Sequence, residues 1–151
     1  MPVPFNILLV DDSTVVHKVL TFRLKLLQWT VVSAHGGRQA IQLFDSTKFN
    51  GIDMVLMDMS MPGMDGRTTT KMLINKGCKT PIFMLTATAG NVAVPGALGV
   101  LRKPFKAPAI VEVLLRAHKK TQNAKAVHVR TCLMQCLYDN SIRGIDSFVQ
   151  M

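Results

Sequence analysis

Short apolar runs alternate with helix-length segments along the first 118 residues of the chain. Each run is largely apolar without strict alternation, which is expected for strands that are covered on both faces of a sheet. We therefore expect five buried strands. They cover residues 5–10, 30–34, 52–57, 81–85 and 100–102.

The segments between these strands carry the spacing of amphipathic helices. Ser13 can cap the first helix, in which apolar residues recur every three or four positions. These residues are Val16, Val19, Leu20, Leu24 and Leu27. Further helices are expected over residues 37–44, 67–75 and 107–118. Strands that alternate with helices indicate βαβ units, hence an α/β fold whose mostly parallel sheet is covered on both faces.

Residues 87–98 should hold the helix between the fourth and fifth strands, but their composition opposes it. They include Gly90, Pro95 and Gly96 and few strong helix formers. Because proline and glycine break or weaken helices, we expect at most one helical turn there.

Polar or charged side chains follow four of the predicted strands. Asp11 and Asp12 follow the first strand, Asp58 the third, Thr86 the fourth and Lys103 the fifth. The carboxyl ends of parallel strands share one edge of the sheet, where open α/β sheets bind their ligands. We therefore expect these five side chains to converge.

This set of side chains suits phosphoryl transfer. Clustered carboxylates repel one another unless a cation neutralises them, and Mg²⁺ prefers such oxygen ligands. A carboxylate such as Asp58 can attack phosphorus, while Lys103 and the Thr86 hydroxyl can contact the equatorial phosphoryl oxygens. A single Asp at a strand end is usually a turn or cap residue. Convergence at several strand ends, in a chain with only nine acidic residues, favours the functional interpretation.

Four motifs in order resemble the response-regulator receiver domains of two-component phosphorelay systems. They are residues 8–13 (LLVDDS), 56–66 (LMDMSMPGMDG), 84–87 (MLTA) and 96–105 (GALGVLRKPF). The resemblance extends from residue 5 to about residue 117. It implies a doubly wound, flavodoxin-like domain with five parallel strands in the order 2-1-3-4-5, here with a shortened fourth helix.

The resemblance also implies a role for each acidic residue. Asp58 would be the phosphoacceptor. Asp12 and Asp58, together with the main-chain carbonyl of Ser60, would hold Mg²⁺, and Asp11 would act on the ion largely through water.

Outside the acidic residues, the resemblance makes Thr86 the switch hydroxyl and Lys103 the phosphate-binding cation, aimed by a cis bond to Pro104. The chain departs from the family pattern in two places. The step from Thr86 to Lys103 is 17 residues, shorter than usual, and Val100 stands where an aromatic residue is common. Both departures concern the face built from the fourth helix, the fifth strand and the fifth helix, where many receivers couple phosphorylation to partners or to dimerisation.

The composition and charge of the chain bear on its partners and on where in the cell it works. The net charge of +9 is spread along the chain, so we expect a solvated surface and disfavour nucleic-acid binding. The sequence has no apolar run long enough for a membrane span, and we expect no secretory signal. Its three cysteines, Cys78, Cys132 and Cys136, have no disulfide-framework spacing and are expected to be free thiols. We expect a cytoplasmic protein, or a nuclear one in a eukaryote.

Two functions remain open. In the first, residues 1–118 form a receiver domain and residues 119–151 a tail of uncertain order, too short for a DNA-binding output domain. Such a stand-alone receiver would take a phosphoryl group from a histidine kinase or a histidine phosphotransfer protein and signal by protein contact or onward transfer. It would be a monomer or weak dimer and not an enzyme. In the second, the domain is a degenerate receiver that only binds proteins. A haloacid-dehalogenase-type phosphatase would need a second acid where Ser60 stands.

Overall fold

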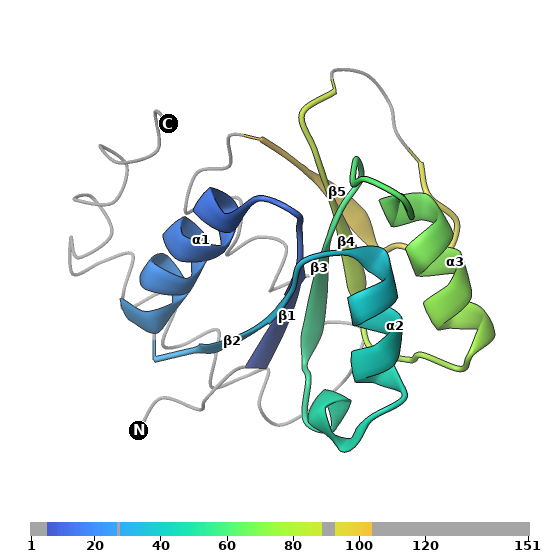
Figure 1. Cartoon of the computed structure of the whole chain (residues 1–151), viewed down its shortest axis with the longest axis horizontal. Helices are drawn as coiled ribbons and strands as arrows, with labels where there is room; N and C mark the ends of the chain where they lie inside the picture. The colour runs from blue at the N-terminus through green and yellow to red at the C-terminus, as the bar shows by residue number, and fades with distance from the viewer. Residues whose placement is uncertain (1–5, 27, 89–92, 104–151) are drawn as a thin grey trace.

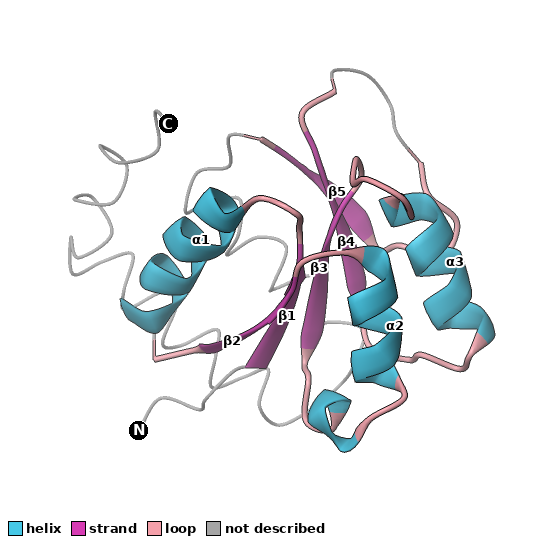
Figure 2. Ribbon diagram, viewed as in Figure 1, coloured by secondary structure: helices cyan, strands magenta, loops and turns pink. Residues whose placement is uncertain are grey.

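The computed structural model describes residues 6–26, 28–88 and 93–103, and this description concerns those residues. Five strands and four helical segments follow one another, coloured along the chain in Figure 1 and by type in Figure 2. In chain order they are β1 (Asn6–Val10), α1 (Thr14–Leu26), β2 (Thr30–Ala34), α2 (Gly37–Phe44), the 3-10 helix η1 (Thr47–Phe49), β3 (Met54–Asp58), α3 (Gly66–Asn75), β4 (Ile82–Thr86) and β5 (Gly99–Arg102).

The five strands form one parallel sheet in the order β2-β1-β3-β4-β5. Strand β1 pairs with β2 on one side and with β3 on the other, so that Val10 is the register partner of Ala34 and of Met57. The chain therefore reverses its winding direction between β2 and β3. In open α/β sheets this reversal leaves a crevice at the carboxyl ends of the strands beside it.

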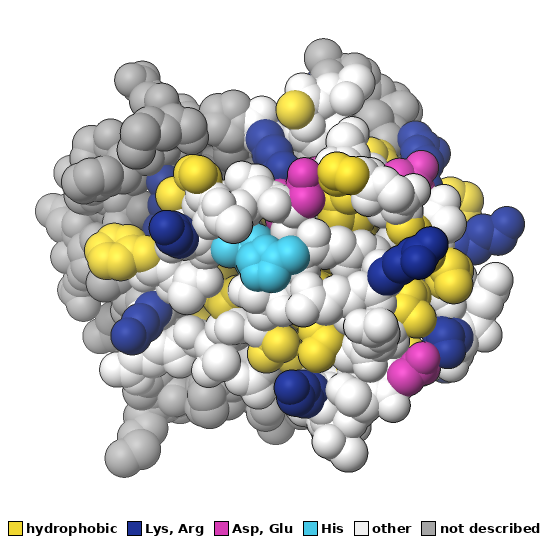
Figure 3. All heavy atoms as spheres, viewed as in Figure 1, with side chains coloured by type: hydrophobic (Ala, Val, Ile, Leu, Met, Phe, Trp, Pro, Cys, Tyr) yellow, Lys and Arg dark blue, Asp and Glu magenta, His cyan; other side chains and the backbone are white. Residues whose placement is uncertain are grey.

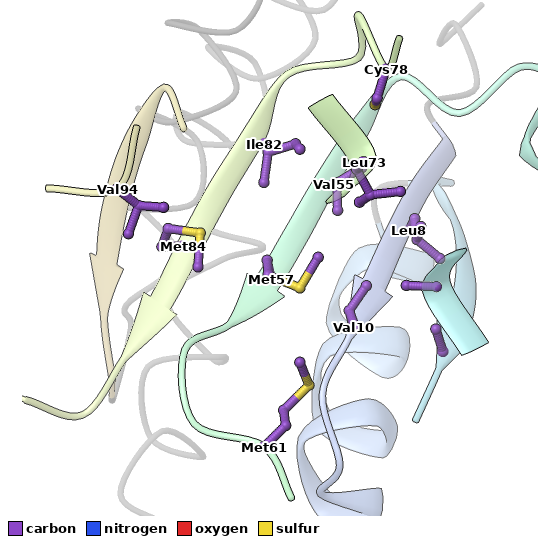
Figure 4. Close-up of a cluster of buried hydrophobic side chains, with 12 residues drawn as sticks. Leu8, Val10, Val55, Met57, Met61, Leu73, Cys78, Ile82, Met84 and Val94 are labelled. Carbon is purple, nitrogen blue, oxygen red and sulfur yellow. The ribbon is translucent and has the colours of Figure 1, made fainter. Parts of the chain in front are cut away.

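Each face of the sheet carries its own apolar layer. Leu9 of β1 packs with Leu20 and Leu24 of α1 on one face. Leu8 and Leu73 belong to the opposite layer, to which α2 and α3 contribute and which Figure 4 shows in close-up. Alternate residues of one strand thus enter different layers. This is why the strands are apolar throughout instead of alternating.

Side-chain caps fix the start of two helices. The Ser13 hydroxyl accepts a hydrogen bond from the Val16 N–H at 3.3 Å, which confirms Ser13 as the cap of α1. The Asp65 carboxylate accepts one from the Thr68 N–H at 2.7 Å, and this bond lowers the pKa of Asp65. Both bonds satisfy main-chain donors that the first turn of a helix leaves without partners. Among the described helices, none has the length and apolarity that crossing a membrane requires.

The observed strands and helices confirm the predicted α/β order. β2 and α2 have the predicted bounds, whereas β3 ends one residue later than expected, at Asp58, and β4 likewise ends at Thr86. Leu27, the predicted helix over 107–118 and the predicted tail over 119–151 lie outside the described residues.

The described residues between β4 and β5 form a turn and no helix. The Ala97 N–H donates to the Val94 carbonyl at 3.0 Å, and Gly96 has a φ of +87°, a conformation that favours glycine. Buried Val94 joins the apolar layer of α2 and α3, while the Leu98 N–H bonds to the Ile82 carbonyl at 2.8 Å. The turn thus leads directly into β5.

Truncating the inner face of α1 should cost far more stability than truncating its outer face. Leu24 is 2% exposed and packs in the core, whereas Phe22 is 65% exposed. We expect Leu24→Ala to lower the free energy of unfolding by about 2–5 kcal/mol, and Phe22→Ala by less than about 1 kcal/mol. Urea denaturation measures both values. Equal losses would contradict the assigned orientation of α1.

Candidate functional site

The sheet brings the predicted site residues to one edge by placing each at the end of a strand. Asp58 is the last residue of β3 and Thr86 the last of β4, while Asp11 directly follows β1. Lys103 directly follows β5, and its N–H donates to the Thr86 carbonyl at 2.7 Å. Four segments that are distant in sequence therefore meet at the carboxyl edge of the sheet.

Lys103 joins two of the acidic residues directly. Its Nζ lies 2.9 Å from Asp11 Oδ2 and 3.2 Å from Asp58 Oδ1. The Asp11 side chain is fully buried, that of Asp58 is 8% exposed and that of Lys103 is 25% exposed. Such close pairing is expected, because a buried carboxylate without a partner is strongly disfavoured.

Asp12 completes an acidic cluster. One carboxylate oxygen each from Asp11, Asp12 and Asp58 lies within 4.8 Å of the others, and Asp12 is exposed. Three carboxylates against the single ammonium of Lys103 leave two negative charges when all are ionised. The donor atoms are all oxygen, which suits a hard divalent cation such as Mg²⁺. The cluster therefore has the chemistry of a metal site.

The surroundings of Asp58 hold its pKa above the ordinary value. Burial is the main cause and the charge of Asp11 adds to it, while Lys103 and a hydrogen bond from the Ser60 main chain oppose them. For Lys103, burial works to lower the pKa, but the hydrogen bond to Asp11 and the charges of Asp11 and Asp58 outweigh it and raise the pKa. A bound cation would reduce the repulsion between the carboxylates that the charge of Lys103 does not neutralise.

Thr86 and Ser60 flank the cluster but make other contacts. Thr86 is buried, and its hydroxyl accepts a hydrogen bond from the Thr88 N–H at 3.0 Å. Ser60 is exposed, and its main chain is bonded to the Asp58 carboxylate. The proposed switch role of Thr86 and the ligand role of the Ser60 carbonyl stay predictions.

A glycine closes the loop that follows Asp58. The Gly66 N–H donates to the Met59 carbonyl at 3.0 Å, while the Met59 N–H donates to the Leu85 carbonyl at 2.8 Å. A Cβ added at Gly66 would overlap the carbonyl oxygen of Asp58. The start of α3 therefore packs directly against the backbone of the candidate phosphoacceptor.

Sequence reasoning missed one buried contact of the site, His17 of α1. Its Nε2 lies 2.7 Å from the Asp11 carbonyl oxygen and its Nδ1 lies 2.8 Å from the Ser33 hydroxyl. The signal was available: His17 precedes Leu20 by three positions and Leu24 by seven, the spacing of one helical face.

The sequence pattern that belongs to this geometry is that of a known family. The family model described as "response regulator receiver domain" matches residues 7–115. The chain belongs to the receiver-domain family. Receiver domains are parts of the response regulators of two-component systems, which are signalling proteins and not classical enzymes.

Curated relatives of this receiver domain are longer proteins. The chain is 35% identical over 127 residues to a probable transcriptional regulator, ycf27, of Guillardia theta, covering 80% of this chain and 48% of that protein. It is 34% identical over 126 residues to the transcriptional regulatory protein CpxR of Escherichia coli, covering 78% of this chain and 52% of CpxR. The chain therefore spans about half the length of the curated relatives it matches.

Solved structures agree on the fold. The chemotaxis protein CheY4 of Vibrio cholerae superposes with a TM-score of 0.63 at 27% identity, over 76% of this chain and 99% of that one. A receiver domain protein from Clostridium thermocellum gives a TM-score of 0.70 at 23% identity, over 78% and 97% of the two chains. The order of the five strands is therefore that of the receiver fold.

Neutralising Asp58 should stabilise the metal-free protein. The raised pKa of Asp58 means that the folded state disfavours its ionised form, at a cost that is present above that pKa and disappears as the pH falls below it. We expect Asp58→Asn to raise the free energy of unfolding at neutral pH, with a gain that shrinks in acid. Urea titrations at several pH values without Mg²⁺ measure this. Asp45→Asn, at an exposed acid paired with Lys76, should show no gain, and a loss in Asp58→Asn would mean that the Lys103 ion pair outweighs burial.

Gly66 should tolerate no side chain. We expect Gly66→Ala to lower the free energy of unfolding by about 1–3 kcal/mol, because the added methyl group must displace the Asp58 backbone. Gly36→Ala is the matched control, since its Cβ would meet no atom within 4 Å and its φ of 178° is extended. Denaturation curves give both values, and similar curves for the two variants would refute the close approach.

Proposed function

We propose that this receiver domain accepts a phosphoryl group on Asp58 from a phosphohistidine of a histidine kinase or histidine phosphotransfer protein. A carboxylate oxygen of Asp58 forms the new bond to phosphorus as the bond to the histidine nitrogen breaks, and the histidine keeps the electron pair. Attack by water later releases phosphate and restores the carboxylate. The domain promotes both steps at its own Asp58, which is the group that is modified and restored.

The position of Lys103 is the observation that carries this proposal. An ammonium held between Asp11 and Asp58 lies beside the oxygen atoms that would receive the phosphoryl group. Phosphoryl transfer depends mainly on positioning and on neutralising the phosphoryl oxygens. Lys103 can supply the neutralisation, and Thr86 at the neighbouring strand end can supply a hydroxyl once it leaves Thr88.

We further propose that Asp11, Asp12 and Asp58, with the Ser60 carbonyl, hold Mg²⁺ in the working protein. The all-oxygen donor set and its excess of two negative charges support this ion. Bound there, Mg²⁺ would neutralise phosphoryl oxygens together with Lys103.

The output of the domain is a separate proposal. The curated relatives are transcriptional regulators about twice as long, so their whole activity is not carried over to this chain. We propose that the phosphorylated domain acts by protein contact or onward phosphotransfer, as a monomer or weak dimer. The turn over 94–97 lies in the segment where at most one helical turn was expected, and it distinguishes this part of the domain.

Phosphorylation can be tested directly with acetyl phosphate and Mg²⁺. We expect intact-protein mass spectrometry to show the addition of one phosphoryl group, abolished in Asp58→Asn and kept in the surface control Asp45→Asn. Lys103→Met should slow the reaction by about 100-fold, the usual cost of removing one oxyanion-stabilising group. Lys76→Met, which breaks an exposed ion pair, should leave the rate unchanged.

Two results would contradict the proposed function. If Asp58→Asn were labelled as strongly as the wild type, another residue would be the acceptor. Absence of label from a folded wild-type protein, with phosphohistidine donors as well as acetyl phosphate, would instead favour the degenerate receiver that only binds proteins.

A further inference from the structure

His17 is a buried polar residue that the proposed chemistry does not use. It is 5% exposed, and both of its ring nitrogens lie within hydrogen-bond distance of oxygen atoms. We propose that His17 is a positioning residue for the acidic cluster, which sets the direction of Asp12 through the main chain of Asp11. The inference rests on the proposed function, because it concerns the same metal site.

The two contacts determine which ring nitrogen carries the proton. The Asp11 carbonyl oxygen can only accept a hydrogen bond, so His17 Nε2 must be the donor. In the neutral ring Nδ1 then accepts, and the Ser33 hydroxyl donates to it. The ring thereby links α1, the loop after β1 and the end of β2.

Asp11 is held at both of its main-chain groups. Its N–H donates to the Ala34 carbonyl at 3.1 Å, and its carbonyl oxygen accepts from His17. That carbonyl belongs to the peptide plane that also contains the nitrogen of Asp12, because a peptide unit is planar. Fixing the oxygen therefore fixes the plane from which the Asp12 side chain departs.

Asp12 needs this support more than its neighbours do. Lys103 holds the carboxylates of Asp11 and Asp58, and the Ser13 N–H also donates to Asp11 at 2.8 Å. Asp12 is exposed, and its carboxylate makes no hydrogen bond within the described part of the chain that would orient it. Its direction therefore depends on the backbone that His17 holds.

A second histidine, His35, lies beside the His17 ring. The rings of His17 and His35 have centroids 4.2 Å apart at an interplanar angle of 45°, and His35 is exposed. Figure 3 shows histidine side chains on the face that also carries acidic side chains nearby. The His35 ring packs beside the His17 ring, and His17, buried there, makes its hydrogen bonds where they are stronger than in water.

Two amide substitutions separate the two nitrogens of His17. The terminal amide of His17→Gln reaches the position of Nε2, so it can still donate to the Asp11 carbonyl. The shorter amide of His17→Asn reaches only the position of Nδ1 and keeps the Ser33 contact. Ser33→Ala removes the Nδ1 contact alone. A buried histidine with a purely structural role would make no distinction between Nε2 and Nδ1 in metal binding.

The experiment is a Mg²⁺ titration of each full-length variant, followed by the amide NMR shifts of Asp12 and Ser13, with urea denaturation alongside. We expect His17→Asn to bind Mg²⁺ about three- to ten-fold more weakly, the usual worth of one hydrogen bond, and His17→Gln and Ser33→Ala to stay within about two-fold of wild type. In acetyl phosphate assays the Asn variant should need more Mg²⁺ for half-maximal rate but reach a similar maximum. Equal Mg²⁺ affinity in all variants would overturn the proposal.

Two further outcomes are informative. If His17→Asn does not fold, the ¹⁵N shifts of the wild-type imidazole provide the test: we expect protonated Nε2, with a shift that follows Mg²⁺ at the same midpoint as Asp12, and protonated Nδ1 would overturn the proposal. A wild-type protein that binds Mg²⁺ normally but is never phosphorylated would refute the proposed function and leave the positioning role intact. A wild-type protein that binds no Mg²⁺ would refute both.

Discussion

The buried carboxylates of Asp11 and Asp58 impose the constraint on which the rest of the site depends. Two like charges this close to the core are tolerated only with a cation between them, and Lys103 supplies it. Burial first, and the charge of Asp11 second, still hold the pKa of Asp58 above its ordinary value, and one ammonium does not balance three ionised acids. This uncompensated negative charge is what favours the proposed Mg²⁺ at the cluster.

The parallel sheet is what makes this charge arrangement possible. Asp11 and Lys103 are 92 positions apart, yet parallel pairing ends their strands at the same edge. Only short segments separate the rigid strands from the charged atoms, because Asp58 is still part of β3 and Lys103 is the first residue after β5. The apolar layers on both faces therefore hold the site in place, and a loss of core packing should act on its chemistry as well.

Much of this could be predicted from the sequence, and the rest depended on contacts that sequence patterns do not encode. Apolar runs predicted the strands because burial on both faces removes polar positions, and strand ends predicted the convergence of Asp11, Asp58 and Lys103. The turn at Val94 was predicted only as a shortened helix of at most one turn, since composition disfavours a helix without specifying what replaces it. The ion-pair geometry of Lys103 and the hydrogen-bond partners of His17 depend on how groups from separate elements meet.

The short connection between β4 and β5 need not disturb the site. A shortened connection could have shifted β5 along the sheet and moved Lys103 away from the acids. Hydrogen bonds oppose such a shift at both ends of the strand, since Leu98 is bonded to Ile82 before β5 begins and Lys103 to Thr86 where it ends. Buried Val94 packs in the layer beneath and holds the turn against the sheet. Register, which pairing and packing determine, therefore positions Lys103 more directly than the length of the preceding connection does.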